Sequence, residues 1–368
     1  MSIDVSVIVP TYNSRDALEL TLTAFNYQTY PFDKYELIVV DDGSSDDTRS
    51  LVDSCETSYP LRYLRQDNAG RCKARNVGIE MAKGDTLILN DADAIPVPNF
   101  IAQHVKSHRS DGSTVVIGGK YDMLTRWENK MYRPHLDALL NASGHFKEVR
   151  ENVTRAQEGK SAIPFILKED IGANFDRVQQ YVFRKSYHNW DSVYDVYSET
   201  LEDFVIPWVL CVTINISLPK ALMMKAGLFD ESFRGWGLED TEMGYRLYQC
   251  GARFVYNEAA TNYHQLHPSD YPKRWREHAR NYKHFCQKHP TLEVYLHWRL
   301  AVGLISPKAY NELVKNFHQI CDLGYKEISE DYLAMSKELA EMYGQDEVFL
   351  SHFPRPVPES LRISDTPN

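Results

Sequence analysis

The sequence predicts an α/β fold in which a mainly parallel central sheet is flanked by helices and followed by a helical C-terminal extension. Four short apolar segments alternate with helical patterns in the first hundred residues. Strands that are apolar on both faces are typical of parallel sheets covered by helices on both sides. Polar clusters follow three of these segments, and the ligands of such sheets bind beyond the carboxyl ends of the strands.

The four expected strands are runs rich in Val, Ile and Leu, at Val5–Val9, Leu37–Val40, Leu61–Leu64 and Thr86–Leu89. Asn13 or Ser14 can cap a helix after the first strand, since both residue types favour that position. A second helix is expected over Ala69–Lys83 and is ended by Gly84. This alternation of strand and helix predicts a parallel sheet.

The second half of the chain is less regular. Trp208–Leu218 is a strand-like apolar run that stops at Pro219, and a helix is expected near Ala221–Ala226. From about Tyr271 onward the chain is amphipathic and helical. These helices either pack on their own domain or join a homo-oligomer.

Composition and charge narrow the class of protein. The chain has 368 residues and a formal net charge of −10, which argues against nonspecific binding to nucleic acid or to an anionic membrane. Its six cysteines are scattered with no CxxC pair, so neither a zinc site nor a disulfide framework is indicated. The chain shows no signal-peptide pattern and no transmembrane-length apolar run, which predicts a cytoplasmic, soluble protein.

Carboxylates stand directly after two of the predicted strands. Asp42 could accept a hydrogen bond from a nucleotide base or ribose, or it could cap the helix that follows. Asp91 and Asp93 bracket one alanine and form either a polar turn or a seat for Mg²⁺ or Mn²⁺, which bind carboxylates together with substrate phosphates. Arg71 and Arg75, at i and i+4 on a helix, could neutralise a diphosphate or simply form a solvated face.

Two further motifs lie downstream. In GWGLED, Gly235 and Gly237 flank Trp236. This arrangement suggests an indole ring held at the surface, where it could pack against the apolar face of a sugar. Glu239 and Asp240 follow at the start of an expected helix, where acidic residues also serve as simple N-terminal capping charges. In NYHQLHP, His264 or His267 could complete a metal site held by carboxylates.

Other nucleotide-binding and hydrolytic classes lack their motifs here. No GxGxxG follows a strand and no GxxxxGK[ST] is present, which excludes the usual dinucleotide and P-loop signatures. The G-x-S-x-G elbow of hydrolases is also absent.

Taken together, SVIVPTYN, ELIVVDDGSSDDT, QDNAGRCKARNVG and LNDADAIP resemble the family 2 glycosyltransferases with a GT-A fold. GLFDESFRGWGLEDTEMGYRL, followed by YHQLHP, resembles the acceptor half of chondroitin-polymerase-type enzymes, β-1,4-galactosyltransferases and polypeptide N-acetylgalactosaminyltransferases. The resemblance implies a Rossmann-like sheet, a UDP-sugar donor and a Mn²⁺ or Mg²⁺ cofactor. The QxxRW motif of processive synthases is not matched, because Tyr271 stands where the Gln is expected.

The resemblance also implies roles for individual residues. The nucleotide-sugar-binding residues would be Pro10, Tyr12, Asn13, Asp42, Arg71, Arg75 and Asp91. Asp93 and His264 would hold the metal, and Trp236 and Glu239 would shape the acceptor site. Asp240 would be the general base.

The implied organisation has three parts: a nucleotide-sugar-binding half over 1–105, an acceptor-binding half over 106–270 with a partly helical insertion at about 120–205, and a helical extension over 271–368. The implied reaction is inverting transfer from a UDP-sugar to a glycan, a lipid-linked saccharide, a small molecule or a peptide. The alternatives are a retaining glycosyltransferase, a catalytically silent nucleotide-sugar-binding or scaffold subunit, and a sugar nucleotidyltransferase. The last lacks its Gly-rich N-terminal loop.

Overall fold

A computed structural model describes residues 2–109, 112–128, 130–159, 162–173, 175–186 and 190–343. The chain divides into two compact units. The sheet unit comprises 1–188, 212–229 and 249–269, and the helical unit comprises 189–211, 230–248 and 270–368. These units cut across the segments expected from the sequence, because 230–248 clusters with the C-terminal helices.

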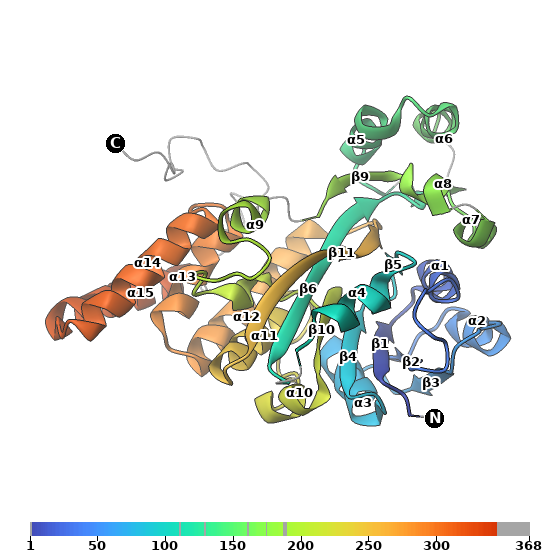
Figure 1. The fold of residues 1–368 in the computed structure, drawn as a ribbon. Helices are drawn as coiled ribbons and strands as arrows, with labels where there is room; N and C mark the ends of the chain where they lie inside the picture. The colour runs from blue at the N-terminus through green and yellow to red at the C-terminus, as the bar shows by residue number, and fades with distance from the viewer. Residues whose placement is uncertain are drawn as a thin grey trace. The chain divides into compact units, whose positions relative to one another are not determined.

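The sheet unit is built on one large mixed sheet (Figure 1). Its strands are β1 (Val5–Thr11), β2 (Tyr35–Asp41), β3 (Leu61–Arg65), β4 (Thr86–Asn90), β5 (Ala94–Pro96), β6 (Thr114–Met123), β9 (Val182–Lys185), β10 (Asn215–Pro219) and β11 (Arg253–Gln265). Their order is β3-β2-β1-β4-β10-β6-β11-β5, with β9 paired to β6. β7 (Arg126–Trp127) and β8 (Ile163–Pro164) form a separate small pair.

The predicted parallel arrangement of the first four strands is confirmed. β1 pairs in parallel with both β2 and β4, and β2 pairs in parallel with β3. The carboxyl ends of β1, β2 and β4 therefore meet at one edge of the sheet, as the register of Thr11 opposite Asp41 shows for the first pair. The three polar clusters noted in the sequence accordingly share that edge.

Helices accompany the strands of the sheet unit. They are α1 (Arg15–Phe25), α2 (Thr48–Ser54), α3 (Arg71–Met81), α4 (Phe100–Ser107), α5 (Pro134–Ser143), α6 (Lys147–Gln157), α7 (Lys168–Ala173), α8 (Phe175–Gln179) and α10 (Lys220–Ala226). A Cβ added at Gly78 in α3 would lie 2.5 Å from Cγ2 of Ile8, so glycine is what lets α3 approach the sheet closely.

The register of β11 determines which residues from distant parts of the chain lie side by side in the sheet. β11 pairs in parallel with β6 and antiparallel with β5. His264 therefore lies opposite Asp122 on one side and opposite Ala94 on the other. Figure 1 shows β6 and β11 running side by side as long strands. A chain segment remote in sequence is thus placed beside the turn that carries Asp93.

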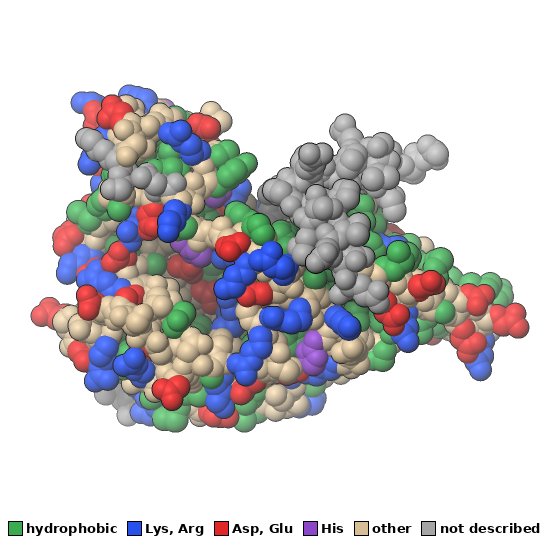
Figure 2. All heavy atoms as spheres, turned by 180° about the vertical axis from the view of Figure 1, so that it is seen from behind, with side chains coloured by type: hydrophobic (Ala, Val, Ile, Leu, Met, Phe, Trp, Pro, Cys, Tyr) green, Lys and Arg blue, Asp and Glu red, His purple; other side chains and the backbone are tan. Residues whose placement is uncertain are grey.

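The helical unit contains α9 (Asp191–Tyr197), the short 3-10 helix η2 (Pro207–Leu210), α11 (Glu239–Gln249), α12 (Tyr271–Lys288), α13 (Leu292–Ala301), α14 (Pro307–Asp322) and α15 (Lys326–Tyr343). Trp208 is buried in its core with its ring against those of Tyr245 and Phe285. A band of Lys and Arg side chains lies over α12 (Figure 2). The predicted helical C-terminal extension is confirmed over α12–α15.

The prediction of one strand over Trp208–Leu218 is wrong. Residues 207–210 form the 3-10 helix of the helical unit, and only Asn215–Pro219 forms a strand, β10, in the sheet unit. An apolar run of this length is equally compatible with a strand and with a buried helical segment. Its first half is apolar because Trp208 enters a helical core, which the local sequence does not reveal.

Two predictions made from the composition of the chain can be compared with the structure. All six cysteines are free thiols, in agreement with the predicted absence of a disulfide framework. Among the described residues, no helix has the length and apolar character needed to cross a bilayer.

Candidate active site

A carboxylate and two imidazoles meet just beyond the end of β4. Nε2 of His267 lies 3.4 Å from Oδ2 of Asp93, and Nε2 of His264 lies 3.7 Å from the same oxygen. One ligand atom from each of the three residues lies within 4.8 Å of the others. The structure therefore brings together the two predicted metal ligands and adds His267, which the sequence left as an alternative.

Buried amide contacts fix the turn that carries Asp93. Nδ2 of Asn90 donates to the carbonyl oxygen of Ala94 at 3.0 Å, which closes the turn. Nδ2 of Asn262 on β11 donates to Oδ1 of Asn90 at 2.9 Å. The backbone N–H of Gln265 donates to the carbonyl oxygen of Asp93 at 2.8 Å. The turn and the histidine-bearing strand are thus held in one geometry.

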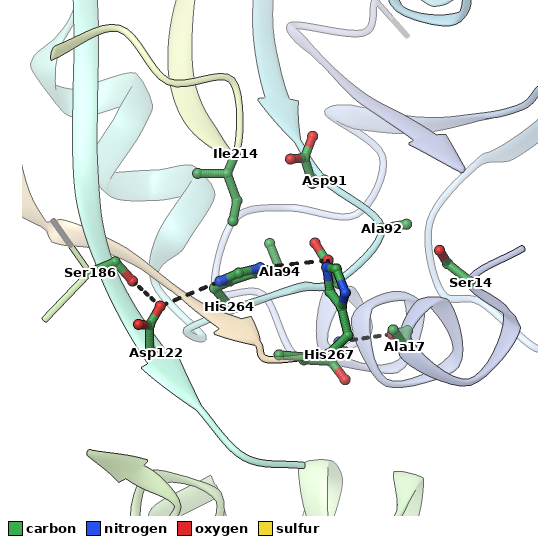
Figure 3. Close-up of polar contacts among 12 residues, drawn as sticks. Ser14, Ala17, Asp91, Ala92, Ala94, Asp122, Ser186, Ile214, His264 and His267 are labelled. Carbon is green, nitrogen blue, oxygen red and sulfur yellow. Dashed lines mark hydrogen bonds and ion pairs between the residues drawn. The ribbon is translucent and has the colours of Figure 1, made fainter. Parts of the chain in front are cut away.

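Asp122 is a site residue that the sequence reasoning missed. Its Oδ1 lies 3.4 Å from Nδ1 of His264, on the opposite side of the ring from Asp93 (Figure 3). Nε of Arg184 donates to Oδ2 of Asp122 at 2.6 Å, and Ser186 donates to Oδ1. A carboxylate on the second ring nitrogen fixes the tautomer and the orientation of a metal-binding histidine. The only signal in the sequence is that Asp122 stands near the end of a long strand.

The electrostatics of this cluster favour a cation. Burial would lower the pKa of His264, but hydrogen bonds and the charges of Asp122 and Asp93 outweigh burial and raise that pKa to about 10. Burial likewise would raise the pKa of Asp122, yet contacts with His264, Ser186 and Arg184 lower it to about 2. Burial would also raise the pKa of Asp93, but its contacts with His264 and His267 lower it. Both carboxylates therefore remain ionised around a protonated His264, and a cation bound at Nε2 would replace that proton.

The donor set fits a divalent cation. Mn²⁺ accepts carboxylate oxygen and imidazole nitrogen ligands together, and such sites usually take further oxygens from substrate phosphates and water. Asp93, His264 and His267 supply one carboxylate and two imidazoles, and the side chains of all three are partly accessible. These three residues would fill only part of the coordination sphere of such a cation.

Asp91 does not point toward the cluster of Asp93, His264 and His267. Figure 3 shows its carboxylate turned away from the two histidines. Nη2 of Arg75 donates to Oδ1 of Asp91 at 3.1 Å, and the Arg75 guanidinium lies over the ring of Phe229. Arg75 is only 3% exposed, whereas Arg71, one turn earlier on α3, is exposed. Of the two arginines, Arg75 orients a strand-end carboxylate and Arg71 is the one accessible to solvent.

Asp42 has a structural role that neither reading of the sequence predicted. Its Oδ1 accepts hydrogen bonds from Nε2 of Gln66 at 2.7 Å and from the backbone N–H of Ala69 at 2.8 Å. Its Oδ2 accepts from the backbone N–H of Gly70 at 2.9 Å. Asp42 thus anchors the loop that enters α3, and the alternative that it caps the helix directly after it is wrong.

The residues after β1 form an accessible rim at the same edge. Tyr12 is 51% exposed, and Pro10 is partly buried. The backbone N–H of Asn13 donates to Oγ of Ser44 at 2.9 Å, and Oδ1 of Asn13 accepts from the backbone N–H of Ser45 at 2.8 Å. Asn13 therefore ties two strand-end clusters together, while the Tyr12 ring is exposed to solvent.

In the helical unit, Trp236 sits on a constrained loop. Gly235 and Gly237 have φ values of +77° and +98°, a backbone region that favours glycine. The backbone N–H of Trp236 donates to Oε2 of Glu277 at 2.9 Å, and Nδ2 of Asn281 donates to the carbonyl oxygen of Gly237 at 2.8 Å. Helix α12 thus holds the loop rigidly.

Glu239 and Asp240 begin α11, as predicted. Glu239 is buried, whereas Asp240 is partly exposed and its Oδ1 accepts a hydrogen bond from the backbone N–H of Thr241 at 2.8 Å.

The sheet and its flanking helices form the GT-A fold of glycosyltransferases. Residues 6–167 match the family model of Glycosyl transferase family 2. This part of the chain is therefore a family 2 glycosyltransferase domain. The domain, together with relatives named as glycosyltransferases, supports a glycosyltransferase enzyme. The predicted GT-A fold is confirmed.

Three known proteins illustrate the relationship. The glycosyltransferase YfnE of Bacillus subtilis is 27% identical over 86% of this chain and 78% of its own length. The chondroitin synthase of Escherichia coli is 29% identical over 72% of this chain, which spans only 35% of that protein. A mannosyltransferase of Pyrobaculum calidifontis, solved with GDP-Man and Mn²⁺, has 16% identity and a TM-score of 0.52 over 94% of this chain and 89% of that one.

Proposed function

We propose that this chain is a metal-dependent, inverting glycosyltransferase that moves a sugar from a UDP-sugar to an acceptor hydroxyl. The observation that carries the proposal is the cluster of Asp93, His264 and His267 at the edge where β1, β2 and β4 end. A similar fold in the Pyrobaculum calidifontis mannosyltransferase was solved with GDP-Man and Mn²⁺, which supports a nucleotide-sugar donor and a metal cofactor. That the nucleotide is UDP rests on the sequence resemblance.

The donor would lie on the sheet unit. Tyr12 would stack on the uracil, and the Asp91 carboxylate oriented by Arg75 would accept hydrogen bonds from the ribose. Asp93, His264 and His267 would hold Mn²⁺ or Mg²⁺, which supplies Lewis-acid neutralisation of the departing diphosphate. Exposed Arg71 would add positive charge near that leaving group.

The acceptor residues would come from the helical unit. Trp236 and Glu239 would shape the acceptor site, and the Asp240 carboxylate would remove the proton of the attacking hydroxyl. One displacement at the anomeric carbon inverts its configuration. Inversion rests on the GWGxED resemblance, in which an Asp stands at 240 where the retaining peptide-modifying relatives usually carry Asn.

We also place the enzyme in the cytoplasm, where its six free thiols would remain reduced. None of the site residues described above selects among a glycan, a lipid-linked saccharide, a small molecule and a peptide as the acceptor. The proposal does not call for a nucleic-acid partner, in keeping with the net charge of −10.

A donor screen tests the proposal directly. The melting temperature is measured with UDP-Glc, UDP-GlcNAc, UDP-GalNAc and UDP-Gal, each with and without Mn²⁺, because a bound ligand raises it by mass action. We expect one donor to raise it only when metal is present, and to release UDP with an acceptor. Metal-independent turnover would refute the metal assignment, whereas binding without turnover across many acceptors would indicate a scaffold subunit.

A further inference from the structure

Helix α12 of the helical unit is strongly basic, although the chain as a whole is acidic. Tyr271–Lys288 contains six Lys or Arg residues and one Glu, in a protein whose net charge is −10. Lys273, Arg276, Arg280 and Lys283 are exposed, and spacings of three and four residues place them along one face of the helix. We call these four residues the basic face (Figure 2).

In the part of the chain that the structure describes, no carboxylate forms a salt bridge with the basic face. Many surface cations elsewhere in the chain do form such bridges. On the same helix, Lys288 pairs with Asp230 at 2.6 Å and with Glu242 at 2.9 Å. Four like charges on neighbouring turns repel one another, and this repulsion destabilises the folded protein. A bound anionic ligand would reduce the repulsion.

The basic face adjoins the Trp236 loop. Arg280 donates to the carbonyl oxygen of Arg234, two residues before Trp236. The Trp236 ring packs edge-on against Trp275 of α12, with centroids 6.2 Å apart, and the Arg274 guanidinium lies over it at 5.5 Å. An aromatic pair with a cation beside it suits a sugar ring that carries or neighbours an anionic group.

Resting on the proposed function, we propose that the acceptor is an anionic saccharide chain. Its sugar at the reacting end would contact Trp236 and Trp275, and its carboxylate or phosphate groups would lie along the basic face. From Lys273 to Lys283 the helix rises about 15 Å, at 1.5 Å per residue. That length fits several repeating units rather than one isolated charge, so the acceptor is an oligomer.

The test measures binding of the full-length chain to four probes: a chondroitin oligosaccharide, a poly(glycerol phosphate) oligomer, uncharged dextran, and phosphatidylglycerol vesicles. We expect one of the two anionic oligomers to bind, with an affinity that falls as salt is raised. The chondroitin and phosphate arms distinguish a carboxylate acceptor from a phosphate acceptor. Binding to neither, equal binding to dextran, or binding to vesicles alone would overturn the proposal.

A charge-reversal variant tests whether the basic face is the surface that binds the anionic oligomer. Lys273→Glu with Arg276→Glu and Lys283→Glu should weaken binding of the anionic oligomer by at least about tenfold, since several exposed charges are reversed together. Lys308→Glu on α14 makes the same change at an exposed lysine outside the basic face and should leave binding unaltered. If the triple variant melts early, Arg276→Gln alone provides the comparison. Unaltered binding by a folded variant would refute the assignment to α12.

The donor screen on the unsubstituted chain separates this proposal from the one on which it rests. If no UDP-sugar raises the melting temperature, the proposed function fails whatever the oligomers do. If a donor binds and no anionic oligomer does, only the anionic-acceptor proposal fails.

Discussion

Asp122 and His264 face each other across the neighbouring parallel strands β6 and β11, with Oδ1 of Asp122 3.4 Å from Nδ1 of His264. The other ring nitrogen of His264 faces Asp93 at 3.7 Å. A histidine held in this way presents Nε2 in a fixed direction. Asp122 is therefore a positioning residue for the proposed metal site, and it is itself held by Arg184 and Ser186.

Replacing Asp122 with Asn should weaken Mn²⁺ binding by about 10- to 100-fold, the range typical of outer partners of metal-binding histidines. Titration of free Mn²⁺ by its paramagnetic resonance signal measures this without any turnover. Glu258→Gln is the matched control, because Glu258 lies on β11, the strand of His264, but contacts Tyr121 and Lys185 instead of His264. Equal Mn²⁺ affinities for the two variants would remove Asp122 from the site.

His267 offers a second prediction. Its Nε2 lies nearer to Asp93 than that of His264 does, although its side chain is 45% exposed. If both histidines bind the metal, His267→Gln and His264→Gln should each weaken Mn²⁺ binding by about tenfold or more. The melting temperature without metal provides the control for folding. A normal Mn²⁺ affinity in His267→Gln would leave His264 as the only imidazole ligand.

The sequence predicted the N-terminal half well for physical reasons. β1, β2 and β4 are short apolar runs that end in polar residues, and each signal is local. Asp93 was predicted as a metal ligand because it lies in the turn that follows β4. Asp122 was missed because only the pairing of β6 with β11, between segments 142 residues apart, brings it to His264. No local pattern encodes such a register.

Asp42 shows a different limit of local reasoning. A carboxylate before a Gly-Ser-rich turn is typical of helix capping, yet its partners are Gln66, Ala69 and Gly70. They belong to the loop that follows a different strand, β3. Residue type predicted only that Asp42 accepts hydrogen bonds, from a nucleotide or from the next helix. Tertiary structure brings it the backbone N–H groups of the loop before α3.

Asp240 should be required for turnover if it is the general base. Asp240→Asn removes the proton acceptor while keeping the size of the side chain, and should lower kcat by about 10²–10⁴. The donor-induced rise in melting temperature should persist, because the proposed donor residues lie on the sheet unit. Thr241→Val tests whether the loss is specific, since Thr241 is the immediate hydrogen-bond neighbour of Asp240. Unchanged kcat in Asp240→Asn would exclude it from catalysis.

The Trp236 loop should depend on Gly235. A Cβ at Gly235 would lie 2.3 Å from Cδ of Glu277, which must then move away from the backbone N–H of Trp236. Gly235→Ala also places a non-glycine residue at positive φ, at a cost of about 1–2 kcal/mol. We expect lower stability by urea unfolding and an altered tryptophan emission spectrum.

Gly303→Ala is the matched control for that variant. Gly303 has a φ of +73° and no atom within 4 Å of an added Cβ, so it reports backbone strain alone. Gly235→Ala should lose more stability than Gly303→Ala, because it adds the clash with Glu277 to the backbone strain, and only Gly235→Ala should raise the acceptor KM. If Gly303→Ala raised it equally, the effect would come from general destabilisation and not from the loop.

Glu242 joins α11 to α12 through a buried ion cluster. The side chain is fully buried and lies 2.8 Å from Arg246, 2.9 Å from Lys288 and 2.9 Å from His289. Burial would raise the pKa of Glu242, but hydrogen bonds from His289, Arg246 and Lys288 outweigh it and lower that pKa to about 2. The ionised carboxylate is therefore the form that stabilises the fold.

This shift predicts a pH-dependent stability. Because the folded pKa lies below the unfolded value of 4.5, Glu242 contributes its full stabilisation above about pH 4.5 and loses it as pH falls toward 2. Glu242→Gln should therefore cost about 3 kcal/mol at pH 7 and progressively less in acid, as measured by urea unfolding from pH 7 to pH 3. Glu330→Gln, at an exposed pair with Lys326 on α15, should change stability by less than about 0.5 kcal/mol at every pH. A loss in Glu242→Gln that is equal at pH 7 and pH 3 would show that the side chain acts through packing and not through its charge.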